Sequence, residues 1–239
     1  MALLEVSGLT RDFGGLRAVS NLSFTVEAGE ILGLIGPNGA GKTTVFNLIT
    51  GFLHPSSGFI SLDGRRISGL KPHDVVRNGI ARTFQIVKPF PNLSVRENVA
   101  LAALVRTADR GEADAEAVRT ITMVGLGEKI DMPASDLTLS EQKHMEIARA
   151  LATGPRLMLL DEPLAGLNPR ETEEACGLIR KIRDSGITVV LVEHVMKIIM
   201  RISDRVVVIR QGAKIADGTP AEVVNDPGVI TAYFGKRGT

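Results

Sequence analysis

The chain has 239 residues, enough for one large domain or two small ones with an ample buried core. Its 28 Lys and Arg residues nearly balance its 27 Asp and Glu residues, so no strongly basic surface points to nucleic acid. The one cysteine, Cys176, excludes disulfides within the chain and fits a reducing compartment.

The N-terminal residues contain no basic stretch followed by a long apolar core, so we expect no signal peptide. No apolar run approaches the roughly 18 residues needed to span a bilayer. The most apolar segment, 188–200, is interrupted by Glu193, His194 and Lys197. The sequence therefore predicts a protein that is cytosolic or peripheral to a membrane.

Alternation of apolar and polar residues predicts short strands over 2–7, 22–26 and 59–62, which we expect to form a small antiparallel sheet. An apolar run at 31–35 reads instead as a buried strand. It is followed by a glycine-rich turn, and then by residues 45–49, which have helical spacing and end at Gly51.

This strand, turn and helix are the context of a P-loop. The turn consists of Gly36, Pro37, Asn38, Gly39, Ala40, Gly41, Lys42 and Thr43, with Thr44 behind it. Glycines let backbone N–H groups approach phosphate oxygens, and the helix N-terminus adds positive potential. Lys42 is placed to reach the β- and γ-phosphates and the Thr43 hydroxyl to ligate Mg²⁺. The sequence therefore predicts binding of a nucleoside triphosphate.

Short runs rich in Val, Ile or Leu predict a parallel sheet with further strands over 80–84, 157–161, 188–192 and 205–209. The pattern is helical between about 86 and 153. A capping box at 94–97 opens a helix that runs to Ala103, and further helices are expected over 112–124 and 140–152. Asn168 and Pro169 start another helix, which Gly186 stops.

These elements predict an α/β fold: a P-loop core with a mostly parallel sheet, an antiparallel β subdomain and a helical insert. We expect one domain over 1–239. Within it, 1–85 and 155–239 form the catalytic core and 86–154 forms a helical subdomain.

Polar residues at the ends of the predicted strands extend the nucleotide site. Asp161 fits the Mg²⁺ side of a P-loop enzyme, and Glu162 is placed to polarise a water that attacks the γ-phosphate. The alternative is a purely structural role, in which the two acids only cap the following loop.

Three further residues have both a functional and a structural interpretation. His194 follows a strand whose end faces the ligand crevice, so we expect a γ-phosphate contact rather than a structural histidine. The Gln85 amide is placed to sense Mg²⁺ or water, or is an ordinary surface glutamine. Phe13, expected in a loop, either stacks on adenine or packs on the core.

Together these residues resemble the ATP-binding subunits of ABC transporters over nearly the whole chain. The P-loop, Gln85, the Asp161–Glu162 pair, the segment 165–169 and His194 occur in the order and spacing of that family. Four stretches resemble the subgroup that serves branched-chain amino acid uptake, namely 13–16, 81–85, 196–205 and 218–235.

The resemblance implies an ATPase that uses ATP and Mg²⁺ and works at the cytoplasmic side of the cell membrane. It implies a second ATP-binding subunit, identical or different, and transmembrane permease subunits as partners, with a solute-binding protein involved indirectly. The segment 89–93 lies where the family docks its permease. No nucleic acid partner is expected.

The chain departs from the family at the signature sequence, Leu-Ser-Gly-Gly-Gln, which contacts ATP held by the other subunit. Counting back from the helix at 147–150 places it on Leu137, Thr138, Leu139, Ser140 and Glu141; an alignment starting at Leu139 is two residues out of register. Glu141 brings an anion near phosphate, which is unfavourable unless its carboxylate turns away. We hypothesise a signature that is weakened but usable, and unequal ATP sites when the partner is a different chain.

Two other functions remain open from the sequence. A catalytically weak, ATP-gated regulatory subunit would fit the altered signature. An ABC ATPase of DNA repair or translation fits less well, because the insert is short and one ATPase unit is present. Among transported substrates, branched-chain or hydrophobic amino acids lead over urea, short amides and lipopolysaccharide.

Overall fold

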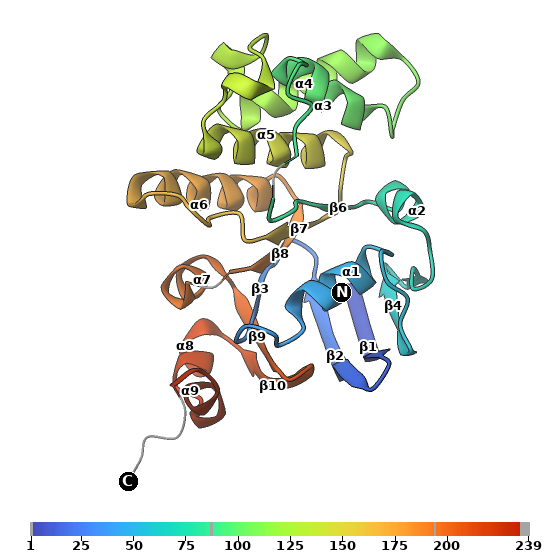
Figure 1. Ribbon diagram of the computed structural model, residues 1–239, viewed down its shortest axis with the longest axis vertical. Helices are drawn as coiled ribbons and strands as arrows, with labels where there is room; N and C mark the ends of the chain where they lie inside the picture. Colours follow the sequence, from blue (N-terminus) through green and yellow to red (C-terminus); the bar gives the residue numbers. More distant parts are fainter. Residues whose placement is uncertain (1, 87, 194, 235–239) are drawn as a thin grey trace.

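Two sheets organise the chain in the computed structural model, which describes residues 2–86, 88–193 and 195–234 (Figure 1). The larger sheet has the strand order β10-β9-β3-β8-β7-β6. Its strands are β3 Ile31–Ile35, β6 Ile80–Arg82, β7 Leu157–Asp161, β8 Thr188–Val192, β9 Arg205–Arg210 and β10 Ala213–Gly218. All neighbours pair in parallel except β10, which is antiparallel to β9. The carboxyl ends of the parallel strands therefore meet at one edge.

Both faces of the larger sheet are covered, which explains the continuous apolar runs of its strands. In β3, Ile31 and Ile35 pack in one apolar cluster with the helices that follow β6 in the chain, whereas Leu32 and Leu34 belong to a second cluster on the opposite face. This second cluster also contains α1 Lys42–Ile49 and the smaller sheet. The P-loop helix is thus held between two sheets.

The smaller sheet is antiparallel, with the order β2-β1-β4-β5. Its strands are β1 Ala2–Phe13, β2 Leu16–Glu27, β4 Ser57–Leu62 and β5 Arg65–Arg66. The first two are longer than the alternation predicts, because register shifts such as the one between Val6 and Leu9 interrupt the period of two. Phe13 consequently ends a strand, where it pairs with Leu16, and the expectation that it lies in a loop is wrong.

The remaining helices are α2 Pro72–Arg77, α3 Val95–Ala103, α4 Arg110–Met123, α5 Leu139–Ala152, α6 Pro169–Asp184, α7 Met196–Ile202, α8 Pro220–Val224 and α9 Pro227–Phe234. The capping box predicted at Ser94 opens α3, and similar boxes open α5 at Thr138 and α6 at Asn168. The helices predicted over 112–124 and 140–152 begin two residues and one residue earlier than expected.

A helical block, formed by α3, α4 and α5, lies at one end of the molecule (top of Figure 1). The chain enters it after β6 and leaves it before β7, and these two strands are neighbours in the sheet. The block is therefore an excursion between adjacent strands, as the sequence predicts for a helical insert. Within the described ranges, no helix combines the length and apolar character needed to cross a membrane.

Candidate functional site

The P-loop connects β3 to α1, as the sequence predicts, and the fold demands glycine at both of its ends. A Cβ on Gly36 would lie 2.1 Å from the Ile209 carbonyl oxygen of β9. A Cβ on Gly41 would lie 2.6 Å from the Ala18 carbonyl oxygen, and its φ of +105° already disfavours other residues. The loop is thus pressed against β9 on one side and β2 on the other.

Lys42 folds back over this loop. Its Nζ donates hydrogen bonds to the carbonyl oxygens of Gly36 at 2.6 Å and Pro37 at 3.1 Å. Burial lowers the pKa of Lys42, and the carboxylates of Glu162 and Asp161 act in the opposite direction. The ammonium group is therefore held among the backbone groups of the P-loop, where phosphate oxygens can take the place of the two carbonyls.

The C-terminal helix α9 also reaches the P-loop. Burial raises the pKa of Tyr233 to about 12, while a hydrogen bond with the Gly36 backbone lowers it. Sequence patterning gives no sign of this contact, because Tyr233 lies almost 200 residues beyond the loop.

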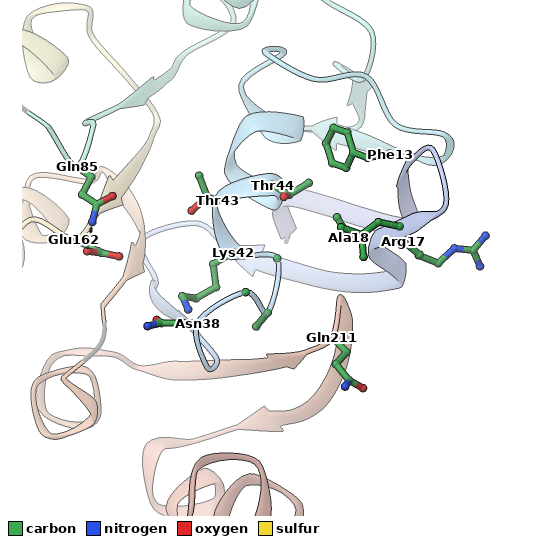
Figure 2. Close-up of a pocket in the computed structure, with 14 residues that line it drawn as sticks. Phe13, Arg17, Ala18, Asn38, Lys42, Thr43, Thr44, Gln85, Glu162 and Gln211 are labelled. Atoms are coloured by element: carbon green, nitrogen blue, oxygen red, sulfur yellow. Dashed lines mark hydrogen bonds between the residues drawn. The ribbon is translucent and has the colours of Figure 1, made fainter.

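A cleft of about 670 Å³ opens over the P-loop (Figure 2). The P-loop residues 38–44 line it, with Gln85 and Glu162 on one side and Phe13, Arg17 and Gln211 on the other. The predicted residues Gln85 and Glu162 are thus brought to the P-loop from distant parts of the chain.

Phe13 stands at the outer side of this cleft rather than in the core. Its side chain is exposed, and the guanidinium of Arg11 lies 4.6 Å from its ring centroid. The exposed side chain does not fit the alternative of core packing.

The acid pair lies at the end of β7. Glu162 has a positive φ of +51°, and its backbone N–H donates to the Val192 carbonyl oxygen at 2.9 Å. Gln85 Nε2 donates to Glu162 Oε2 at 2.7 Å. An unusual backbone conformation, fixed by the neighbouring strand, therefore directs the Glu162 carboxylate toward Gln85 and the cleft.

Asp161 has a partner that the sequence analysis missed. Arg82, the last residue of β6, donates from Nη2 to Asp161 Oδ2 at 2.7 Å, and both side chains are 6% exposed. Asp161 also has a backbone N–H that donates to the Thr83 hydroxyl at 3.3 Å. A charged arginine in a strand predicted to be buried is the signal that would have revealed this pair.

The residues present fit Mg²⁺ bound together with a nucleotide. Within the described residues there is no group of three or more His, Cys, Asp or Glu side chains that could hold a metal alone. In nucleotide sites, Mg²⁺ is usually held through one or two carboxylates and completes its shell with other oxygens, mainly from phosphate and water. Oxygen donors on Thr43, Asp161 and Gln85 at the edge of the P-loop match that habit.

The predicted signature forms the N-terminus of α5. Thr138 is its N-cap and accepts a hydrogen bond from the Glu141 N–H at 3.3 Å, and Glu141 Oε2 accepts one from the Thr138 N–H at 3.0 Å. Lys129 Nζ lies 2.5 Å from Glu141 Oε1, and this contact lowers the pKa of Glu141. The carboxylate thus turns back onto its own helix, as the sequence analysis required. Of the other signature residues, Leu137 is buried, Ser140 is half-buried and Leu139 is exposed.

Two further residues of α5, also missed, fasten the helical block to the site. Lys143 Nζ donates to the carbonyl oxygens of Glu162, Pro163 and Ala165, in the loop after the acid pair. Glu146 Oε1 accepts a hydrogen bond from the Phe84 N–H at 2.6 Å, one residue before Gln85. The signature helix therefore contacts both segments that carry the predicted catalytic side chains. His194, predicted to contact the γ-phosphate, lies outside the described residues.

Comparisons with known proteins agree with this geometry. The family model for ABC transporters matches residues 19–165, and that for the branched-chain amino acid ATP-binding cassette transporter matches residues 213–239. The chain is 45% identical to the high-affinity branched-chain amino acid transport ATP-binding protein BraF of Pseudomonas aeruginosa, with 98% of each chain covered. It is 44% identical to LivG of Escherichia coli, again over 98% of each chain.

A solved structure extends the match to three dimensions. The ADP conformation of an ATP-binding cassette of an ABC transporter superposes with a TM-score of 0.90 at 28% identity. The match covers 99% of this chain and 100% of that one. Fold, site geometry and sequence lead to one conclusion: the chain belongs to the ABC transporter family of ATP-binding proteins, and it is an ATPase.

Proposed function

We propose that the chain is the ATP-hydrolysing subunit of an importer for branched-chain or other hydrophobic amino acids. The assignment of ATP hydrolysis rests on one observation: Gln85 and Glu162, hydrogen-bonded to each other, line the same cleft as the P-loop. The amino acid substrate is supported by the names of BraF and LivG, and by the C-terminal match over 213–239.

The site residues have distinct roles in this proposal. Lys42 and the backbone N–H groups of 36–44 bind the phosphates, and Phe13 stacks on the base. Glu162 orients and polarises the attacking water, with Gln85 holding its carboxylate and His194 contacting the γ-phosphate. Thr43, Asp161 and Gln85 would hold Mg²⁺, which would supply positive charge against the charge that develops on the phosphates.

A second ATP-binding subunit completes each site in this proposal. The signature, 137–141, faces the γ-phosphate of ATP bound by the partner, so two sites form when two subunits close face to face. Closure moves the helical block, for which we propose the bounds 86–154, against the core formed by 1–85 and 155–239. Preferential binding of ATP to the closed state drives the movement.

The permease is proposed to dock on a groove between the block and the core. This groove, of about 490 Å³, is lined by Phe84, Ile86, Lys88 and Arg149 among others, and Phe84 and Ile86 are exposed. Arg149 donates to the Lys88 carbonyl oxygen at 3.2 Å, which fixes the segment leading to 89–93 on the face of α5. The chain thereby sits on the cytoplasmic side of the membrane, and a solute-binding protein acts outside it.

Transport by reconstituted vesicles tests the proposal. The chain is purified with its co-purifying membrane subunits, and uptake of labelled leucine is measured with ATP, against isoleucine, valine, urea and acetamide as competitors. We expect ATP-dependent uptake that isoleucine and valine inhibit, and that both Lys42→Ala and Glu162→Gln abolish. Inhibition by urea or acetamide alone would contradict the amino acid assignment. ATP binding without turnover in the complete transporter would favour the regulatory alternative.

A further inference from the structure

Arg82 makes polar contacts with two separate parts of the nucleotide site. Its Nη2 donates to Asp161 Oδ2 at 2.7 Å, and its Nη1 donates to Asn47 Oδ1 at 2.6 Å. Asn47 belongs to α1, the helix that the P-loop opens, whereas Asp161 ends β7. One buried guanidinium therefore joins the phosphate-binding helix to the strand that carries the acid pair.

Two aromatic rings hold the same guanidinium in place. The Arg82 Cζ lies 5.5 Å from the ring centroid of Phe46, on α1, and 5.0 Å from that of Phe84. Phe84 is fixed in turn by its N–H, which donates to Glu146, and by an edge contact with Phe52. The arginine thus lies between a core ring and a ring on the wall of the 490 Å³ groove.

This arrangement is poorly explained by stability alone. Arg82 Nε is buried and finds no hydrogen-bond partner within the described chain, which opposes folding. Buried ion pairs are in any case weak stabilisers, and apolar pairs of similar volume often replace them without loss. A buried cation that leaves one donor unpaired suggests that its position serves the site.

The position of Arg82 determines how Asp161 can act. One oxygen of the Asp161 carboxylate is committed to Arg82, so the carboxylate cannot rotate freely about its bond to Cβ. Thr43 and Asp161 line the same groove as Arg82. Residues behind a metal ligand commonly fix its orientation, and their loss costs about 10- to 100-fold in metal affinity or activity.

We propose that Arg82 is a positioning residue for Mg²⁺-dependent ATP hydrolysis, which fixes the Asp161 carboxylate relative to the P-loop helix. This role rests on the proposed function, in which Asp161 is on the Mg²⁺ side of the site. Arg82 itself touches neither nucleotide nor metal in the proposal; it acts through Asp161 and Asn47.

Nucleotide affinity measured with and without Mg²⁺ tests this role in the full chain. A Glu162→Gln background prevents turnover, and ATP binding is measured in excess Mg²⁺ and in EDTA. We expect Arg82→Met to reduce the gain in affinity that Mg²⁺ provides by about tenfold, with affinity in EDTA little changed. Arg82→Lys keeps the charge and should recover part of that gain. In the complete transporter with Glu162 intact, the factor by which Arg82→Met lowers kcat should exceed the factor by which it changes KM.

Control variants separate positioning from folding. Arg205 makes a two-pronged pair with Asp217, at 2.7 and 2.9 Å, far along the sheet, so Arg205→Met should leave the Mg²⁺ gain unchanged. Asn47→Leu removes the other polar partner of Arg82 and should produce a smaller loss in the same direction; it also serves where Arg82→Met fails to fold. An unchanged Mg²⁺ gain in all Arg82 and Asn47 variants, with a lowered Tm, would overturn the proposal. Absence of any Mg²⁺ gain in the Glu162→Gln background alone would instead overturn the proposed metal site, and with it this role.

Discussion

Single residues of the site are positioned mainly by contacts with segments distant in the sequence. Lys42 lies on carbonyls of its own loop, but Gln85 meets Glu162 across 77 positions, and Arg82 meets Asp161 across 79. The Gln85–Glu162 and Arg82–Asp161 contacts both depend on β6 and β7 being neighbours in the sheet. The chemistry of the site is therefore a product of sheet order as much as of motif.

Glu141 stands where the signature expected for the family has glutamine. Its carboxylate caps its own helix and is paired with Lys129, and both side chains are partly exposed. In the proposed dimer this helix end faces a phosphate group, so an uncompensated carboxylate would repel it. Lys129 thus allows a glutamate to occupy the position.

A double-mutant cycle tests this compensation. At the effective dielectric of a protein surface, one uncompensated charge is worth about 1 kcal/mol after screening, or roughly fivefold in kcat/KM. We expect Lys129→Met to lower kcat/KM for ATP by that factor, and Glu141→Gln to raise it. In the Glu141→Gln background, Lys129→Met should have a smaller effect, because Lys129 then has no carboxylate to hold away from the phosphate.

The control for this cycle is another ion pair of the helical block. Arg119 and Glu116 pair on α4 at 2.6 Å, and Arg119→Met should leave ATP turnover unchanged. Equal losses from Lys129→Met in both backgrounds would show that Lys129 acts independently of Glu141.

The sequence predicted the contiguous parts of the site but not the partners that fix them. The P-loop and the Asp161–Glu162 pair are short motifs with defined neighbours, so local pattern is sufficient. Arg82 and Lys143 lack such a motif, and their importance comes from strands and helices that pack far along the chain. The roles of the predicted residues remain predictions.

At the scale of elements, the buried parallel strands were predicted best. The bounds of β3, β7 and β8 agree with the apolar runs, because burial on both faces favours apolar residues along most of each strand. The sequence did not predict β10, whose pairing at the sheet edge leaves it only partly buried. Short helices such as α2 were missed for a similar reason, since few of their residues face the core.

Helix α5 is the element that connects the helical block to the core. Burial raises the pKa of Glu146, while the Phe84 N–H, Arg149 and Lys143 act in the opposite direction. A folded-state pKa above the unfolded value means that the folded protein binds this proton more tightly. Stability from this group is therefore present at low pH and falls as pH rises from about 4.5, the ordinary glutamate value, through the raised pKa.

Glu146→Gln should remove this dependence while keeping an oxygen for the Phe84 N–H. We expect the free energy of unfolding of the variant, relative to the unsubstituted protein, to increase between pH 4 and pH 7. Urea unfolding at several pH values measures it. Glu222→Gln is the control, because its pKa is lowered by the Thr219 N–H and its effect should have the opposite sign. A constant difference across pH would contradict the assignment.

The whole molecule is a core with an inserted helical block, joined by apolar packing in one shared cluster and by a few buried polar side chains. Lys143 and Glu146 cross from the block to the loop after Glu162 and to Phe84, while the main chain crosses only before and after the block. In the proposed cycle, the block shifts as a unit when a nucleotide is bound. Among the described residues, none of the predicted signature, 137–141, lines the cleft, so a partner supplies it in the proposal.

Self-association of the purified chain measures how usable this signature is. With Glu162→Gln to prevent turnover, we expect the chain to be monomeric without nucleotide and to dimerise weakly with ATP and Mg²⁺, because Glu141 lies at the helix end that faces the partner's phosphate. Adding Glu141→Gln should strengthen the dimer several-fold, and Lys42→Ala should prevent it. Light scattering over a range of protein concentrations reports the change. A dimer that forms equally well without ATP, or that Glu141→Gln does not affect, would contradict a phosphate contact at the signature. Weak self-association together with tight ATP-dependent binding to a second ATP-binding chain would indicate a heterodimer with unequal sites.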